Sequence, residues 1–245
     1  MSDPHPETTR IRHAVAAVQK RWRWIADMGS TIVWSPVAQV TSALRCPSEA
    51  LTMAVGVLQA GGTVVLPTDT VYGVGAAASI PEATRVLFAL KDRSDAQPLA
   101  VLVADTAQAL ELVDPAAIDD RVQAWMGRWW PGPLTLVLPR SEVARGLELG
   151  GRPDTVGVRC PDSAFVRALA AQVGPIATTS ANRHGEPTAT EAGAAAASLD
   201  GLVDLVVDGG PSGTVASTVV DVCGPTPKVL REGTVSAADL GLSSL

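Results

Sequence analysis

Residues 61–75 read GGTVVLPTDTVYGVG and combine a short apolar run with a cluster of side-chain oxygens. The run from Thr63 to Leu66 is β-branched and apolar, and glycines and Pro67 bound it, so it predicts a buried strand rather than a helix. Thr68-Asp69-Thr70 follows at the carboxyl end of that strand, where open α/β sheets bind their ligands. The stretch therefore predicts a binding site for a polar ligand.

Composition narrows the class of protein. The 245 residues carry 19 Lys and Arg against 25 Asp and Glu, a formal net charge of −6, which argues against a broadly basic nucleic-acid surface but leaves a local basic patch open. The 22 glycines and 18 prolines suit an α/β chain of many short elements. No apolar run could cross a bilayer or serve as a signal-peptide core, so we expect a cytoplasmic protein with no membrane partner.

The three cysteines, Cys46, Cys160 and Cys223, are far apart and form no CxxC pair. They indicate neither a disulfide framework nor a zinc site, and a reducing compartment fits them.

Residues 1–46 differ from the rest of the chain. Basic residues between Arg10 and Arg23 lie beside Trp22 and Trp24, a composition that fits an arm contacting RNA or a partner. A poorly ordered extension is the other interpretation, and it is the one we adopt. We therefore expect an N-terminal extension over 1–46 and a single α/β domain over 47–245.

From Pro47 the chain alternates predicted helices and strands. A helix ends at Gly61-Gly62, a loop of small residues follows Gly75, and two capping boxes, Ser79 with Glu82 and Thr188 with Glu191, open further helices. After the strand at 63–66, we expect strands at about 98–104, 134–138, 155–159, 176–179, 205–207, 217–222 and 229–231.

Three sites could carry chemistry, and each also has a structural explanation. Lys91 and Arg93 at a helix end could clamp an anion or simply complement the helix dipole. The polar run Thr178 to Asn182 could bind oxyanions and a nucleobase edge or form an Asx turn. Gly209 to Gly213, followed by Ser217 and Thr218, could form an anion nest, although it is not a P-loop.

The segment Gly73 to Ala78 matches the relaxed dinucleotide pattern G-x-G-x-x-A. That pattern requires a strand running straight into the first glycine and a helix opened by its last position. Here Pro67-Thr68-Asp69-Thr70 intervenes and the helix begins only near Pro81, so we reject a Rossmann site.

Taken together and in this order, seven motifs resemble the YrdC-like threonylcarbamoyladenylate synthases. The motifs are PTDTVYG at 67–73, K-x-R at 91–93, WPGPLT at 130–135, V-x-V-R-x-P at 156–161, TSAN at 179–182, STVVD at 217–221 and LREG at 230–233. The resemblance implies an α/β fold with a twisted mixed sheet and flanking helices around a large concave cavity. It also implies the condensation of L-threonine, bicarbonate and ATP to threonylcarbamoyl-AMP and pyrophosphate. Mg²⁺ would arrive with ATP rather than in a protein cage, and the product would serve tRNA modification, with tRNA or a transferase as partner.

The resemblance also implies roles for particular residues. The catalytic set falls on Lys91, Arg93, Ser180 and Asn182. Threonine would be held by Thr68, Thr70, Tyr72 and Arg159, and the nucleotide by Thr179, Ser217, Thr218 and Arg231. We interpret Asp69 as a turn former, because its carboxylate would repel anionic substrates.

The chain departs from the family pattern at His184, where a small residue is usual, and at Gln97, where some members have histidine. It should be the short form, without the C-terminal domain of longer members. Two other functions stay open: an RNA-binding, translation-associated relative without synthase activity, and a carbamoyl-transfer module, although such modules usually sit in much longer chains. The presence of Lys91 and Asn182 favours the synthase.

Overall fold

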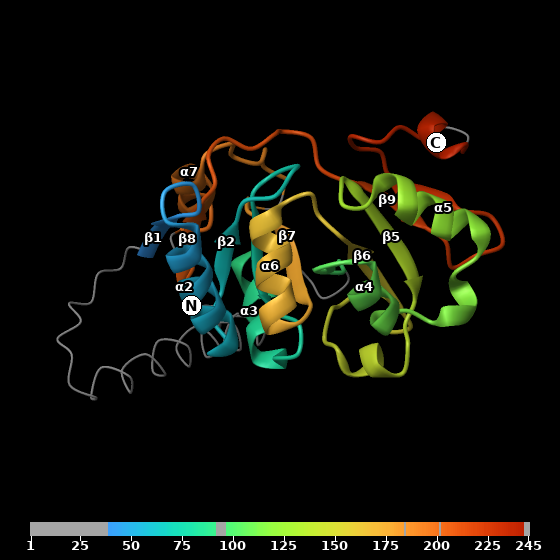
Figure 1. Ribbon diagram of the computed structural model, residues 1–245, viewed down its shortest axis with the longest axis horizontal. Helices are drawn as coiled ribbons and strands as arrows, with labels where there is room; N and C mark the ends of the chain where they lie inside the picture. The colour runs from blue at the N-terminus through green and yellow to red at the C-terminus, as the bar shows by residue number, and fades with distance from the viewer. Residues whose placement is uncertain (1–38, 92–96, 184, 201, 243–245) are drawn as a thin grey trace, which may run out of the picture. The chain divides into compact units, whose positions relative to one another are not determined.

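The computed structural model describes residues 39–91, 97–183, 185–200 and 202–242. In this part of the chain ten strands form one mixed sheet in the order β1-β8-β2-β3-β7-β4-β6-β5-β9-β10 (Figure 1). The strands are β1 Gln39–Ser42, β2 Val64–Leu66, β3 Gly73–Ala77, β4 Ala100–Leu102, β5 Leu134–Pro139, β6 Thr155–Arg159, β7 Ile176–Ser180, β8 Leu205–Asp208, β9 Thr218–Asp221 and β10 Lys228–Arg231. The predicted α/β fold with a mixed sheet and flanking helices is confirmed.

Helices flank this sheet. The α-helices of the described residues are α2 Pro47–Gln59, α3 Pro81–Leu90, α4 Thr106–Leu112, α5 Asp120–Trp129, α6 Ala164–Val173 and α7 Ala192–Ala197. Short 3₁₀ turns are η2 Pro115–Ala117, η3 Val143–Gly146 and η4 Ala238–Leu240. Both predicted capping boxes are wrong: Ile80 precedes α3 and Glu191 precedes α7, and neither side chain caps its helix. Pro81 at the first helical position starts α3 instead.

The strand β3 begins at Gly73 and extends into the segment after Gly75, where we predicted a loop. It pairs antiparallel with both neighbours, placing Gly73 opposite Leu66 of β2 and opposite Ser180 of β7. A Cβ atom on Gly75 would lie 2.8 Å from Ile176 Cγ2, so glycine lets the packed layer approach the strand closely. Because Gly73–Ala77 is a strand and opens no helix, the rejection of a Rossmann site is confirmed.

One half of a sheet face is covered by α2 and α6. Every second residue of a strand points to the same face, and in β2 and β8 these residues are apolar. They form one buried cluster with the two helices, whose members include Leu58, Val64, Leu66, Val166, Leu169, Ile176, Leu205 and Val207. Residues of the opposite parity, such as Val65 and Val206, belong to a second cluster that includes α3 and α7.

The first strand lies inside the segment that we predicted as an extension. Gln39–Ser42 pairs in parallel with β8, with Gln39 opposite Leu205 and Ser42 opposite Asp208. The regular structure therefore begins before the expected boundary at residue 47. Residues 1–38 of the predicted extension lie outside the described residues, and that part of the prediction stays a prediction.

Within the described ranges, no helix combines the length and the apolar character that a membrane span requires.

Candidate active site

A cavity of about 260 Å³ lies on the sheet face formed by β4, β6, β5 and β9. Alternate residues of these strands make its floor, because every second side chain points to one face. The floor residues are Ala100, Leu102, Thr135, Val137, Thr155, Gly157, Arg159 and Val219. The cavity adjoins the covered half of the same face, since Ile176 packs against the helices while Thr178, two residues further along β7, lines the cavity.

Gly157 lies in the middle of the floor. The strand register places it opposite Ala100 of β4 and opposite Val137 of β5. A Cβ atom there would make ordinary contacts of 3.7 Å to Thr135 Cγ2 and 3.8 Å to Val137 Cγ2. Packing therefore does not require a glycine at this position. The absence of a side chain leaves open space above the floor of the cavity.

Lys91, Ser180 and Asn182 come together beside the cavity, as predicted for the catalytic set. Lys91 follows α3 and is only 2% exposed. Its Nζ donates to the Ser180 carbonyl oxygen at 2.8 Å, to Asn182 Oδ1 at 2.6 Å and to Ser180 Oγ at 3.3 Å. Ser180 lines the cavity, so the ammonium group lies behind that hydroxyl. Arg93, the fourth predicted member, lies outside the described residues.

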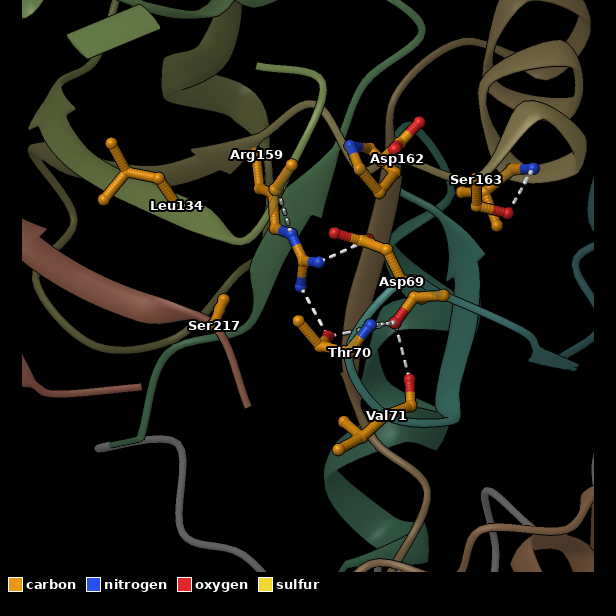
Figure 2. A network of polar contacts seen from close by, with 12 residues as sticks. Asp69, Thr70, Val71, Leu134, Arg159, Asp162, Ser163 and Ser217 are labelled. Carbon is orange, nitrogen blue, oxygen red and sulfur yellow. Dashed lines mark hydrogen bonds and ion pairs between the residues drawn. The ribbon is translucent and has the colours of Figure 1, made fainter. Parts of the chain in front are cut away.

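Arg159 lines the cavity and is held on three sides (Figure 2). Its Nε donates to the Gly132 carbonyl at 2.9 Å, its Nη1 to Thr70 Oγ1 at 2.9 Å and its Nη2 to Asp69 Oδ1 at 2.5 Å. Burial lowers the pKa of the Arg159 guanidinium, and the Asp69 carboxylate opposes that shift. Arginine stays protonated in any case, so Arg159 is a fixed, oriented cation.

Asp69 therefore does more than form a turn. Its side chain is 14% exposed and forms an ion pair with Arg159, from 90 positions further along the chain. This pairing corrects our interpretation of Asp69 and explains how a carboxylate can lie next to an anion site, because a cation directly beside it offsets its charge.

Thr68 and Thr70 present hydroxyls to the cavity from the loop between β2 and β3. The Thr68 hydroxyl donates to the Val71 carbonyl at 2.6 Å and lies 3.1 Å from Thr70 Oγ1. Since the single Thr68 proton goes to Val71, the proton in the second contact comes from Thr70. Thr70 Oγ1 then accepts from Arg159, so the threonines and the arginine form one connected network.

Arg231 forms the other cationic wall. Its Nε donates to the Ser217 carbonyl at 3.0 Å and its Nη2 to Ser217 Oγ at 3.1 Å. Ser217 Oγ lies 2.9 Å from Thr135 Oγ1. Arg231 is close enough to Arg159 for its charge to lower the pKa of Arg159. Among the described lining residues two are arginines and none is acidic, so the cavity attracts anions.

Two predicted residues do not reach the cavity. The Tyr72 side chain is fully buried, and its hydroxyl donates to the Gly210 carbonyl at 2.6 Å and accepts from the Gly209 N–H at 3.1 Å. Thr218 is also fully buried, and its Oγ1 accepts from the N–H groups of Gly233 and Val235. Neither is among the cavity-lining residues, whereas Thr179 is. Conversely, Thr135 lines the cavity although we assigned it no role. The sequence did contain a signal for it: Thr135 is a polar residue in the predicted strand that follows WPGPL.

Comparison with known proteins identifies the family. A protein-family model described as "Telomere recombination", for the Sua5/YciO/YrdC domain, matches residues 56–233. The chain belongs to the Sua5/YciO/YrdC family. The predicted resemblance is confirmed.

Several Sua5/YciO/YrdC relatives have names that state an activity. The Bacillus subtilis protein called threonylcarbamoyl-AMP synthase is 37% identical over 219 residues, which are 89% of this chain and 59% of the relative. A Mycobacterium leprae protein called putative threonylcarbamoyl-AMP synthase is 38% identical over 188 residues, 76% of this chain and 83% of the relative. This chain thus spans somewhat more than half of the first relative and most of the second.

Solved structures of the Sua5/YciO/YrdC family share the fold. Pyrococcus abyssi Sua5, in a crystal structure described as complexed with L-threonine, superposes with a TM-score of 0.71 at 34% identity over 81% of this chain and 58% of Sua5. Escherichia coli YciO gives a TM-score of 0.73 over 83% of this chain and all of YciO, at 24% identity, which supports the fold alone.

Proposed function

We propose that this chain is a threonylcarbamoyl-AMP synthase that condenses L-threonine, bicarbonate and ATP and releases pyrophosphate. The observation that carries the proposal is the cavity between Lys91-Ser180-Asn182 on one side and Arg159 and Arg231 on the other. Three anionic groups, the threonine carboxylate, bicarbonate and the triphosphate, require such a concentration of cations. The names of the relatives support the same activity.

The proposed reaction has two bond-forming steps. The threonine amine attacks the bicarbonate carbon and water leaves; one oxygen of the resulting carbamate then attacks the α-phosphate and pyrophosphate leaves. Both steps gain chiefly from positioning and from neutralisation of negative charge. We assign charge neutralisation and orientation at the reacting groups to Lys91, Ser180 and Asn182, with Arg93 as the predicted fourth member.

The two arginines mark the two ends of the proposed substrate arrangement. Arg159, with Thr68 and Thr70, would hold the threonine carboxylate through charge-assisted hydrogen bonds. Arg231 and Ser217, with Thr179, would lie along the nucleotide. We assign no direct substrate contact to Tyr72 or Thr218, because their hydroxyl groups bond to the backbone and neither residue lines the cavity.

Mg²⁺ would enter with ATP. Within the described residues, no group of three or more His, Cys, Asp or Glu side chains could hold a metal ion. The cavity offers hydroxyls and cations, so phosphate oxygens and water would supply most Mg²⁺ ligands. We also propose a cytoplasmic location and a downstream transferase that passes the product to tRNA.

The decisive experiment incubates the purified chain with ATP, L-threonine, ¹³C-bicarbonate and Mg²⁺. We expect pyrophosphate release that needs all three substrates, and ¹³C in a product with the mass of threonylcarbamoyl-AMP. Release that is unchanged when threonine is omitted would refute the proposal. Binding of tRNA without any pyrophosphate release would favour the RNA-binding alternative.

A further inference from the structure

The segment 209–217 crosses from β8 to β9, from one side of the sheet to the other, and we call it the strap. In Figure 1 it is the orange segment along the top, between β8 and β9. Tyr72 fixes its first two residues, because the buried hydroxyl accepts from Gly209 N–H and donates to Gly210 C=O. One side chain of the PTDTVYG motif thereby satisfies two backbone groups of the strap.

Two glycines let the strap lie directly on the loop between β2 and β3. A Cβ atom on Gly209 would lie 2.5 Å from Pro67 Cβ, and one on Gly213 would lie 2.7 Å from the Thr70 carbonyl oxygen. A Cβ atom does not approach another heavy atom this closely, so any side chain at Gly213 would push the strap away from Thr70. The strap is thus fitted to the loop that carries the proposed threonine ligands.

The far end of the strap forms part of the other cavity wall. Ala216 and Ser217 line the cavity. Ser217 is the residue to which Arg231 donates two hydrogen bonds, from Nε and Nη2. The strap therefore links the threonine-side loop at one end to the nucleotide-side wall at the other.

We propose that Tyr72 and Gly213 are positioning residues that set the strap, and through it the nucleotide-side wall at Ser217 and Arg231. Tyr72 then acts from behind the cavity, in place of the direct threonine contact that the family resemblance implied. The inference rests on the proposed function, because it assigns ATP to the wall that the strap carries.

Removing the hydroxyl alone tests this assignment. Tyr72→Phe keeps the ring in the core but leaves the Gly209 N–H and the Gly210 C=O without their partner. We expect the KM for ATP to rise about tenfold, the KM for L-threonine to stay within about twofold, and amide exchange in the peptide 209–217 to accelerate about tenfold. If Tyr72 contacted the substrate threonine directly, the KM for L-threonine would rise and the KM for ATP would stay near the wild-type value.

Gly213→Ala provides a second variant that leaves Tyr72 intact. The added methyl group meets the Thr70 carbonyl, so we expect the same selective rise in the KM for ATP. Ser141→Ala is the matched control. Like the Tyr72 hydroxyl, the Ser141 hydroxyl donates to a carbonyl, that of Glu111, and accepts from an N–H, that of Ala144, but these partners lie outside the strap. We expect both KM values of the control to match the wild type.

The outcomes separate this inference from the proposed function. A rise in the KM for threonine alone would overturn it, as would a lower melting temperature with both KM values unchanged in the two variants. If the wild type shows no threonine-dependent pyrophosphate release, the proposed function fails. ATP affinity by calorimetry and exchange of the strap then decide the present inference: equal values in wild type, Tyr72→Phe and Gly213→Ala would refute it.

Discussion

The two halves of one sheet face differ in the residues that point out of it. At β2 and β8 these residues are Val64, Leu66, Leu205 and Val207, and α2 and α6 cover them. At β5 and β6 they include Thr135, Gly157 and Arg159, and the same face holds a cavity. Apolar side chains gain roughly 25 cal/mol for each Å² buried, which favours a helix above them, whereas small and polar side chains leave room for a ligand.

The largest effect, a loss of activity, should come from a substitution at the half of the face that holds the cavity, which we call the open half. Lys91→Met keeps most of the length of the side chain but removes the ammonium group that contacts Ser180 and Asn182. We expect kcat/KM to fall about a thousandfold, since an oriented cation at developing negative charge contributes that much. Pyrophosphate release under saturating and limiting ATP measures the loss. Circular dichroism must show a folded protein, and activity within about threefold of wild type would remove Lys91 from the site.

A substitution in the half covered by α2 and α6 should lower the stability of the protein rather than its activity. Leu58 of α2 is fully buried beneath this helix, in the cluster with Val64 and Leu66. Leu58→Ala should lower the free energy of unfolding by about 2–5 kcal/mol, because it removes buried methyl groups and leaves a cavity. Urea denaturation measures the change. Activity per folded molecule should stay near wild type at low temperature; a large loss there would mean that the two halves are not separable.

Filling the open half tests the comparison directly. Gly157→Val places an apolar side chain on the cavity floor in the way that Val64 and Leu66 face the helices. Because a Cβ atom at this position has ordinary contacts, we expect stability to stay level or rise by up to about 1 kcal/mol. The KM for at least one substrate should rise about 30-fold as the cavity fills. Gly157→Ala should give a smaller rise; unchanged kinetics in both variants would place the substrates elsewhere.

Sequence reasoning located most of the sheet but missed β1 and β3. Strands such as Leu134–Pro139 and Thr155–Arg159 carry β-branched or apolar runs bounded by turn residues, and the pattern finds them. Gly73–Ala77 holds a single Val among Gly and Ala residues, which are depleted in strands, so its local preference for a strand is weak. Its pairing with β2 and β7 supplies the missing preference, and that is a property of the tertiary structure.

The site was predictable in type but not in geometry. Ordered motifs indicated Lys91, Ser180 and Asn182, and the structure brings them within hydrogen-bond distance. No local sequence pattern predicts that Asp69 pairs with Arg159, since the two residues are 90 positions apart. The direction of the Tyr72 hydroxyl was also hidden, because a motif names a residue without saying which way its side chain points.

The smallest expected effect is on the pH dependence of stability and concerns Cys160. This residue directly follows Arg159 at the end of β6, and its side chain is buried in the core. Burial raises the pKa of the Cys160 thiol from 9.0 to about 11. The unfolded chain therefore loses this proton at a lower pH than the folded chain. The stability that the protonated thiol contributes is fully present below pH 9 and is lost as the pH rises from about 9 to about 11.

Comparison of wild type with Cys160→Ala isolates this contribution. Tyr72, whose pKa burial also raises, is present in both proteins, so its own titration cancels. We expect wild type to lose about 1–2 kcal/mol more unfolding free energy than Cys160→Ala between pH 8.5 and 11, although the variant starts lower because of the methyl-sized gap it creates. Urea denaturation across this range measures the difference. Parallel pH curves would show that the thiol is hydrated in the folded chain rather than enclosed by the core, and would contradict this prediction.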